Sequence, residues 1–117
     1  MVRDPRAWLW DIQQACQNLA AFLHGVDLDA YLANALVRAG VERQFEIIGE
    51  ALSQLSRSAP ELAQQVPDFK QIVGFRNILI HGYATVDNEQ VWRIAQSRLP
   101  ILSATMLVLL SEPRDPP

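Results

Sequence analysis

Apolar residues recur along most of the chain at intervals of three and four positions, which is the period of a helix with one buried face. β-branched residues do not alternate with polar ones, so the pattern predicts no strands. We therefore expect an all-α fold, an up-and-down bundle of four or five helices. The expected domain spans residues 1–112, and residues 113–117 are expected to form a disordered tail.

The first helix is expected to begin with Asp4 as its cap and Pro5 in its first turn, and to end at His24 and Gly25. Its predicted inward face comprises Trp8, Ile12, Ala15, Leu19, Phe22 and Leu23.

A second, long helix is expected from Leu28 to about Ser56. Gly40 and Gly49 interrupt its helix propensity, so each is expected to mark a bend or a close helix crossing. The predicted inward face comprises Tyr31, Leu32, Ala35, Leu36, Ala39, Phe45, Ile48, Leu52 and Leu55.

The segment 58–61 (Ser-Ala-Pro-Glu) predicts the cap and start of a short helical turn that stops at residues 66–67. Asp68 is expected to cap the next helix, which runs from Phe69 towards His81 and ends at a left-handed Gly82.

Asp87 is expected to cap the last helix, in which Pro100 predicts a kink. Its inward residues are predicted to be Val91, Ile94, Leu99, Met106, Leu109 and Leu110.

Composition adds two expectations about partners. Half of the 117 residues are hydrophobic, so we expect surplus apolar surface to be buried in a homodimer. The net charge of −3 gives no global positive field, which counts against a protein that coats DNA. RNA binding would have to come from a few cations gathered in one cleft.

Cys16 is the only cysteine, so no intrachain disulfide is expected and a cytoplasmic location is favoured. Residues 1–5 lack the pattern of a secretory signal. The apolar run 101–110 is shorter than the roughly 20 residues that span a bilayer. We therefore expect a soluble protein without membrane contact.

The segment 76–83 (Arg-Asn-Ile-Leu-Ile-His-Gly-Tyr) carries the distinctive chemistry. On a helix, Arg76 falls within an apolar arc, where a guanidinium needs a partner or a polar cleft. Glu42, Glu46 and Glu50 form an acidic stripe on the long helix, and any of them could hold it. The position is thus either a structural Arg-Glu clasp or a functional site.

Asn77 and His81 are four residues apart and share a helix face beside Arg76, and Tyr83 follows just beyond Gly82. Imidazole can transfer protons near neutral pH, and a guanidinium can hold a phosphate, so these residues suit RNA transesterification without a cofactor. A metal site is not expected, because His24 and His81 are the only histidines and are far apart.

The pattern Arg76, His81 and Tyr83, with Asn77 as the polar residue after the arginine, resembles the Arg-x-x-x-x-His-x-Tyr mark of HEPN domains. The chain is similar to the HepT-like HEPN toxins of minimal-nucleotidyltransferase/HEPN toxin-antitoxin modules, also in segments 8–12, 46–51, 74–77 and 91–92. It departs from them at Phe75, where a small or polar residue is usual, and at residues 68–70.

The resemblance implies a helical-bundle homodimer in which both copies of the motif line one cleft. It also implies a metal-independent endoribonuclease toxin that cuts RNA such as tRNA, with a nucleotidyltransferase antitoxin as partner. Adenylylation of Tyr83 by that antitoxin would block phosphate entry by bulk and negative charge. The competing hypotheses are a non-catalytic helical module that binds a nucleotide or a partner protein, and a plain four-helix bundle.

Overall fold

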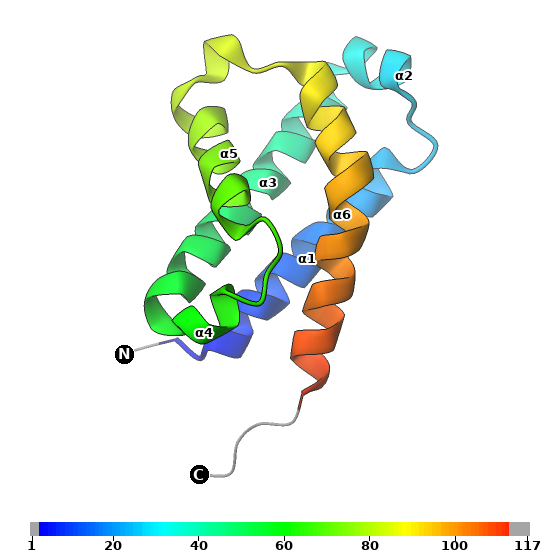
Figure 1. Cartoon of the computed structure of the whole chain (residues 1–117). Helices are drawn as coiled ribbons and strands as arrows, with labels where there is room; N and C mark the ends of the chain where they lie inside the picture. The colour runs from blue at the N-terminus through cyan, green and yellow to red at the C-terminus, as the bar shows by residue number, and fades with distance from the viewer. Residues whose placement is uncertain (1–2, 113–117) are drawn as a thin grey trace.

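The fold is described by a computed structural model over residues 3–112, apart from the side chain of Tyr83 (Figure 1). Within this part of the chain every regular element is helical, which confirms the predicted all-α class. The elements are α1 (Pro5–Leu23), α2 (Leu28–Ala33), α3 (Ala35–Ser58), α4 (Pro60–Ala63), α5 (Phe69–His81), the 3₁₀ turn η1 (Tyr83–Thr85) and α6 (Asn88–Ser111).

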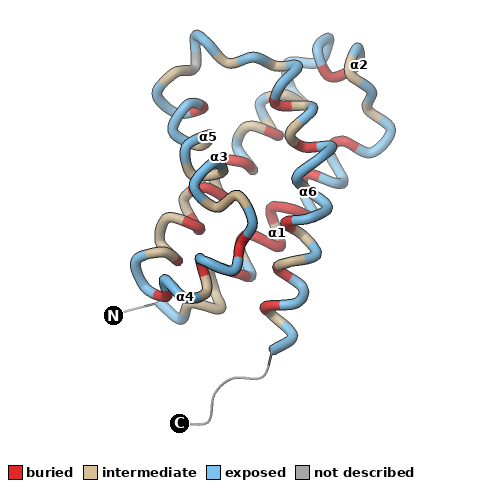
Figure 2. The backbone as a smooth tube through the Cα atoms, viewed as in Figure 1, coloured by how far each residue is buried: buried red, intermediate tan, exposed pale blue. Residues whose placement is uncertain are grey.

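Helix α3 is the centre of the bundle, because it packs against α1 and also carries α5. Helix α6 packs against α1, so α5 and α6 are held by different neighbours (Figure 1). The buried residues line the inner faces of α1, α3 and α6 (Figure 2). Among the fully buried are Leu9, Ile12, Leu19, Ile48, Leu52, Leu55 and Met106.

Local capping interactions set the ends of α1 and the start of α6. The Asp4 side chain accepts a hydrogen bond from the Arg6 backbone N–H, and Pro5 stands at the first helical position. The chain leaves α1 at His24, and Gly25 has the left-handed φ of +71° that lets it turn. Asp87 accepts from the Gln90 backbone N–H at the start of α6. These bounds agree with the sequence pattern.

The prediction of one continuous helix from Leu28 to Ser56 is wrong, because the chain breaks at Asn34. Asn34 has an extended backbone, with φ −121° and ψ 96°, and its side-chain oxygen accepts from the Val37 N–H. An asparagine side chain competes for backbone hydrogen bonds in this way. It therefore ends α2 and caps α3.

The break also changes which residues face inward. Leu36 is 83% exposed, and Leu32, Ala35 and Ala39 are also exposed, although all four were predicted to face the core. A single helical phase cannot be carried across a break, so the buried face of α3 begins only at Val41. Separately, Phe22 near the end of α1 was predicted inward and is 40% exposed. Trp8, predicted inward, is half-buried against the core.

Among the predicted terminal signals of α4 and α5, the cap and start of α4 within residues 58–61 and the N-cap position of Asp68 are confirmed, whereas the left-handed Gly82 is wrong. Ser58 is the last residue of α3, and Ala59 is the N-cap of α4. Asp68 stands at the N-cap of α5 but makes no capping hydrogen bond, because its carboxylate pairs with Arg98 instead. Gly82 is not left-handed, since its φ is −112°.

Helix α6 continues through Pro100 for 24 residues. An 18-residue window of this helix has a mean hydropathy of 1.4, so α6 is long and apolar enough to cross a membrane by length and composition alone. Within the bundle α6 buries Val91, Ala95 and Leu102, and 22% of its apolar window is buried. A single helix of this kind is weak evidence for a membrane span. The expected tail, 113–117, lies outside the described residues.

Candidate active site on helix α5

Helix α5 lies unusually close to α3 at Gly49. A Cβ on Gly49 would stand 2.2 Å from the Cβ of Arg76, so only a glycine fits at this crossing. Sequence reasoning expected Gly49 to mark a bend or a close crossing, and the structure shows a close crossing. The approach brings the start of the Arg76 side chain directly against the backbone of α3.

Arg76 is held by two polar partners. Its Nη2 donates to Oε2 of Glu50 over 2.9 Å, and its Nη1 donates to Oδ1 of Asn77 over 3.0 Å. Its Nε–H is buried and has no hydrogen-bond partner among the described residues. Each Nη atom carries a second N–H, so the guanidinium keeps donors for a ligand.

The structure separates the three glutamates of the acidic stripe. Glu50 binds Arg76, whereas Glu46 lies 3.7 Å from Arg43. Burial raises the pKa of Glu42, the charge of Glu46 raises it further, and Arg38 partly offsets this by lowering it. Arg76 is therefore paired with the glutamate nearest to the Gly49 crossing.

Arg76 borders a pocket of about 230 Å³ between α1, α3 and α5. Trp8 and Ile80 form part of its apolar lining, and the carboxylates of Asp11, Glu46 and Glu50 outnumber the guanidinium groups of Arg43 and Arg76. A phosphate would meet more negative than positive charge in this pocket. Sequence reasoning did not place Asp11 and Arg43 beside Arg76, because those residues meet only through the packing of α1, α3 and α5.

Asn77 and His81 lie on the outward side of α5, one helical turn apart, and both are exposed. Ile78 between them is 52% exposed. The structure thus joins Arg76 to Asn77 by a hydrogen bond, whereas His81 forms no hydrogen bond or ion pair with either of them within residues 3–112. The side chain of Tyr83, the fourth predicted site residue, lies outside the described part of the structure.

Phe75 departs from the expected family pattern, and the structure shows what it does. Its ring packs edge-to-face on Phe45 of α3, with ring centroids 5.3 Å apart and an interplanar angle of 77°. Phe75 therefore adds an aromatic contact between α3 and α5.

Within residues 3–112, no three His, Cys, Asp or Glu side chains are placed to hold a metal ion together. The three described site residues on α5, Arg76, Asn77 and His81, carry a guanidinium, an amide and an imidazole. Such groups can bind an anion and transfer a proton.

A helical bundle with this arginine, asparagine and histidine on one helix has the features of an HEPN domain. The chain belongs to the ribonuclease HepT-like family, whose sequence model matches residues 12–109. Helices α3 and α5 and nearly all of α6 fall inside this match.

Relatives with related names come from archaea and bacteria. The chain is 36% identical over 98 residues to "Putative RNase MJ1380" of Methanocaldococcus jannaschii, covering 84% of this chain and 89% of the relative. It is 29% identical over 111 residues to "Putative RNase TTE0752" of Caldanaerobacter subterraneus, covering 95% and 98%. It is 28% identical over 102 residues to "Probable ribonuclease HepT" of Thermococcus cleftensis, covering 87% and 92%. No solved structure matches the chain significantly.

Proposed function

We propose that the protein is the toxin of a type VII-like toxin-antitoxin module, a metal-independent endoribonuclease that cuts RNA such as tRNA in the cytoplasm. The observation that carries the proposal is the arrangement on α5. Asn77 and His81 share its exposed face, and Asn77 also accepts a hydrogen bond from Arg76. Membership of the ribonuclease HepT-like family supports the same reaction class.

In the proposed reaction, the imidazole of His81 removes the proton from a ribose 2′-hydroxyl. The 2′ oxygen then bonds to phosphorus, the bond from phosphorus to the 5′ oxygen breaks, and the departing 5′ oxygen takes a proton from the imidazolium. The products are a 2′,3′-cyclic phosphate and a 5′-hydroxyl. The free N–H groups of Arg76 stabilise the charge that develops on the phosphate, and Asn77 orients it.

The test is cleavage of RNA in the presence of EDTA. The wild-type protein is expected to cut, with cyclic phosphate ends, and His81→Ala is expected to lose the activity. His24→Ala is the matched control, because His24 is the other histidine and is also exposed. Equal cleavage by wild type and His81→Ala, or equal loss in His24→Ala, would contradict the proposal.

We further propose that the active form is a homodimer joined along the outward face of α5. Gly74 on this face has nothing within 4 Å of where its Cβ would lie, so no intrachain contact explains a glycine there. A mid-helix glycine costs roughly 1 kcal/mol relative to alanine, so a partner that approaches the backbone closely supplies a reason for it. Exposed Ile78 supplies apolar surface beside it.

Dimerisation is tested with Ile78→Glu, which is expected to yield a folded monomer without cleavage activity. Leu36→Glu is the control, because Leu36 is even more exposed but lies at the start of α3. Sedimentation gives the oligomeric state, and the EDTA assay gives the activity. Full cleavage by a monomeric Ile78→Glu protein would count against a shared cleft.

We also propose that a nucleotidyltransferase antitoxin silences the enzyme by adenylylating Tyr83. The chain has two tyrosines, and Tyr31 is fully buried, with burial raising its pKa to about 12. Tyr31 is thus closed to a modifying enzyme. An AMP group two residues beyond His81 would add negative charge and bulk at the end of α5 and oppose phosphate binding.

Intact-mass measurement after incubation with ATP and the antitoxin tests this step. Mass increases by whole AMP units are expected on wild type and not on Tyr83→Phe, together with loss of cleavage. An unchanged mass gain in Tyr83→Phe would exclude Tyr83 as the acceptor.

The ion pair between Arg76 and Glu50 favours a second candidate function, a non-catalytic module that binds a nucleotide or partner protein. In that case the pair is a structural clasp between α3 and α5.

A further inference from the structure

We propose that the cavity between α3, α5 and α6 is a binding site for a nucleobase. The cavity has a volume of about 240 Å³ and lies on the flank of α5 away from the Arg76 pocket. Taking RNA as the source of the base rests on the proposed function. The binding chemistry itself follows from the residues around the cavity.

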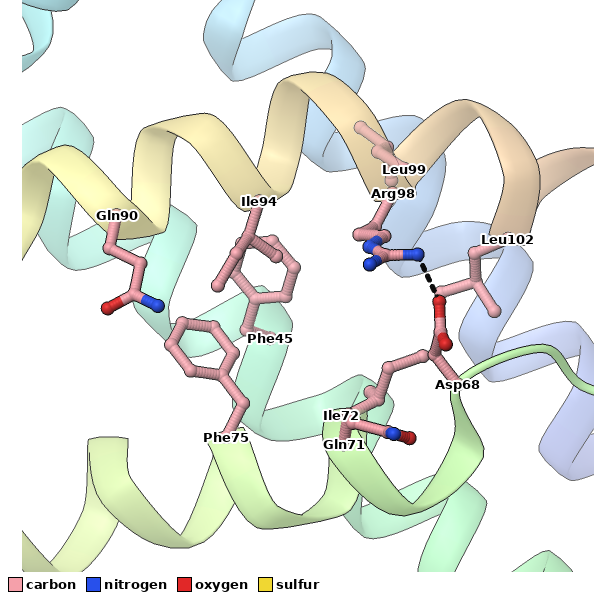
Figure 3. A pocket seen from close by; sticks show the side chains of 10 residues that line it. All are labelled: Phe45, Asp68, Gln71, Ile72, Phe75, Gln90, Ile94, Arg98, Leu99 and Leu102. Atoms are coloured by element: carbon pink, nitrogen blue, oxygen red, sulfur yellow. Dashed lines mark hydrogen bonds and ion pairs between the residues drawn. The ribbon is translucent and has the colours of Figure 1, made fainter.

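The cavity exists because α5 and α6 rest on different neighbours. Helix α5 packs against α3, and helix α6 packs against α1. Side chains from α5 and α6 point towards each other across the space between them (Figure 3). At one end, Arg98 of α6 donates to the carboxylate of Asp68 at the start of α5 (Figure 3). Within residues 3–112 this ion pair is the only hydrogen-bonded contact between α6 and the start of α5, and it lines that end of the cavity.

The walls are apolar and partly aromatic. Phe45 and Phe75 form one wall as an edge-to-face pair. Ile72, Ile94 and Leu99 are only half-buried although they pack against the core, so each leaves apolar surface open to the cavity. A flat, ring-shaped ligand would cover this surface and pack on the aromatic side chains.

Two glutamines add hydrogen-bonding groups to the apolar lining. Gln71 of α5 and Gln90 of α6 are exposed, and neither carboxamide forms a hydrogen bond within the described residues. A carboxamide presents a donor beside an acceptor, the arrangement with which Gln pairs to the edge of adenine. A lipid chain or an aliphatic side chain would leave both amides unused. Apolar walls and two free carboxamides together favour a planar base.

The position of the cavity suits a base next to the cleaved phosphate. Phe75 and Arg76 are adjacent on α5, so the cavity and the Arg76 pocket flank the same stretch of helix. The outward face between these flanks carries Asn77 and His81. An RNA strand lying along α5 can thus place a phosphate at the exposed face and turn one base into the cavity.

The experiment follows the methyl NMR signals of Ile72, Ile94, Leu99 and Leu102 during titration with adenosine 5′-monophosphate. The wild-type protein is used, because adenosine 5′-monophosphate has no 3′-phosphodiester that the proposed reaction could cleave. Saturating shifts are expected at these four residues and not at Ile101 and Leu107, which are exposed elsewhere on α6. Ribose 5-phosphate, which lacks the base, is expected to give no shift at the cavity.

Gln90→Leu is expected to weaken binding about tenfold, the effect of losing one good hydrogen bond. The backbone N–H of residue 90 still donates to Oδ1 of Asp87, so the cap at the start of α6 is kept. Gln96→Leu, an exposed glutamine that does not line the cavity, is the matched control and should bind normally.

Absence of shifts at the cavity, or equal shifts with ribose 5-phosphate, would overturn the proposal. Indane is an apolar ring system without a hydrogen-bonding edge. If it binds equally to wild type and Gln90→Leu, and the protein shows no preference for the nucleotide, the site is only an apolar cavity. Either failure leaves the ribonuclease proposal standing, because cleavage is not measured. Conversely, nucleobase binding by a protein that cuts no RNA would refute only the proposed catalysis.

Discussion

Nη2 of Arg76 lies 2.9 Å from Oε2 of Glu50, and this ion pair joins α5 to α3 beside the Gly49 crossing. The side chains are 27% and 46% exposed, so solvent screens the pair. Pairs of this kind contribute about 1 kcal/mol or less to stability. The pair therefore cannot by itself account for an arginine at this position.

Arg76→Ala is expected to abolish RNA cleavage while lowering the free energy of unfolding by only about 1 kcal/mol. Glu50→Ala removes the same ion pair but keeps the guanidinium, so it should lose similar stability and retain cleavage. Urea denaturation and the EDTA assay measure the two effects. If both variants lose cleavage equally, or if Arg76→Ala fails to fold, the clasp of the binding-module hypothesis is the better account.

Gly49→Ala is expected to destabilise the protein by roughly 1–3 kcal/mol, because the new Cβ would stand 2.2 Å from the Cβ of Arg76 and force the helices apart. Gly74→Ala is the control on α5. It has open space for a Cβ and should stabilise the isolated chain by roughly 1 kcal/mol through helix propensity. Thermal unfolding at a protein concentration where the chain is monomeric compares the two. If Gly49→Ala and Gly74→Ala changed the melting temperature equally, the close crossing of α3 and α5 at Gly49 would be contradicted.

Glu42→Gln is expected to raise the melting temperature at neutral pH. Burial is the main cause of the raised pKa of Glu42, so the folded protein binds its proton more tightly than the unfolded chain. The resulting stabilisation is complete below the unfolded pKa of about 4.3 and is lost as the pH rises through the higher folded value. Glutamine stays neutral throughout.

The advantage of Glu42→Gln over wild type should therefore disappear in acid. Melting curves between neutral pH and about pH 4 test this, with Glu61→Gln on the exposed surface as the control. A gain that is the same at every pH would point to a cause other than the charge of Glu42.

Cys16 is expected not to react with thiol reagents in the folded protein. Its side chain is buried, and burial raises the pKa of the thiol to about 12, so almost no thiolate is present at neutral pH. Mass spectrometry after treatment with iodoacetamide should show no adduct under native conditions and one adduct in denaturant. Rapid labelling of the native protein would mean that the region around Cys16 in α1 opens readily.

Much of the fold follows from local sequence signals. The Asp4-Pro5 start, the Gly25 turn and the Asp87 cap depend on contacts within a few residues, so the sequence predicts them without knowledge of packing. The inward positions of Ile12, Leu19, Ile48 and Leu52 follow from helical period alone. Asn34 was the missed local signal, since asparagine is a preferred N-cap residue.

By itself the sequence determined the all-α class, the helix that carries Arg76, Asn77 and His81, and the need for a partner at Arg76. Only the tertiary structure decided that this partner is Glu50, that Asp68 pairs with Arg98 instead of capping α5, and that a cavity separates α5 from α6. The physical reason is the sequence distance over which each interaction acts. Helical period and capping act over about four residues, whereas Arg76 and Glu50 are 26 residues apart and meet only because Gly49 lets two helix backbones approach.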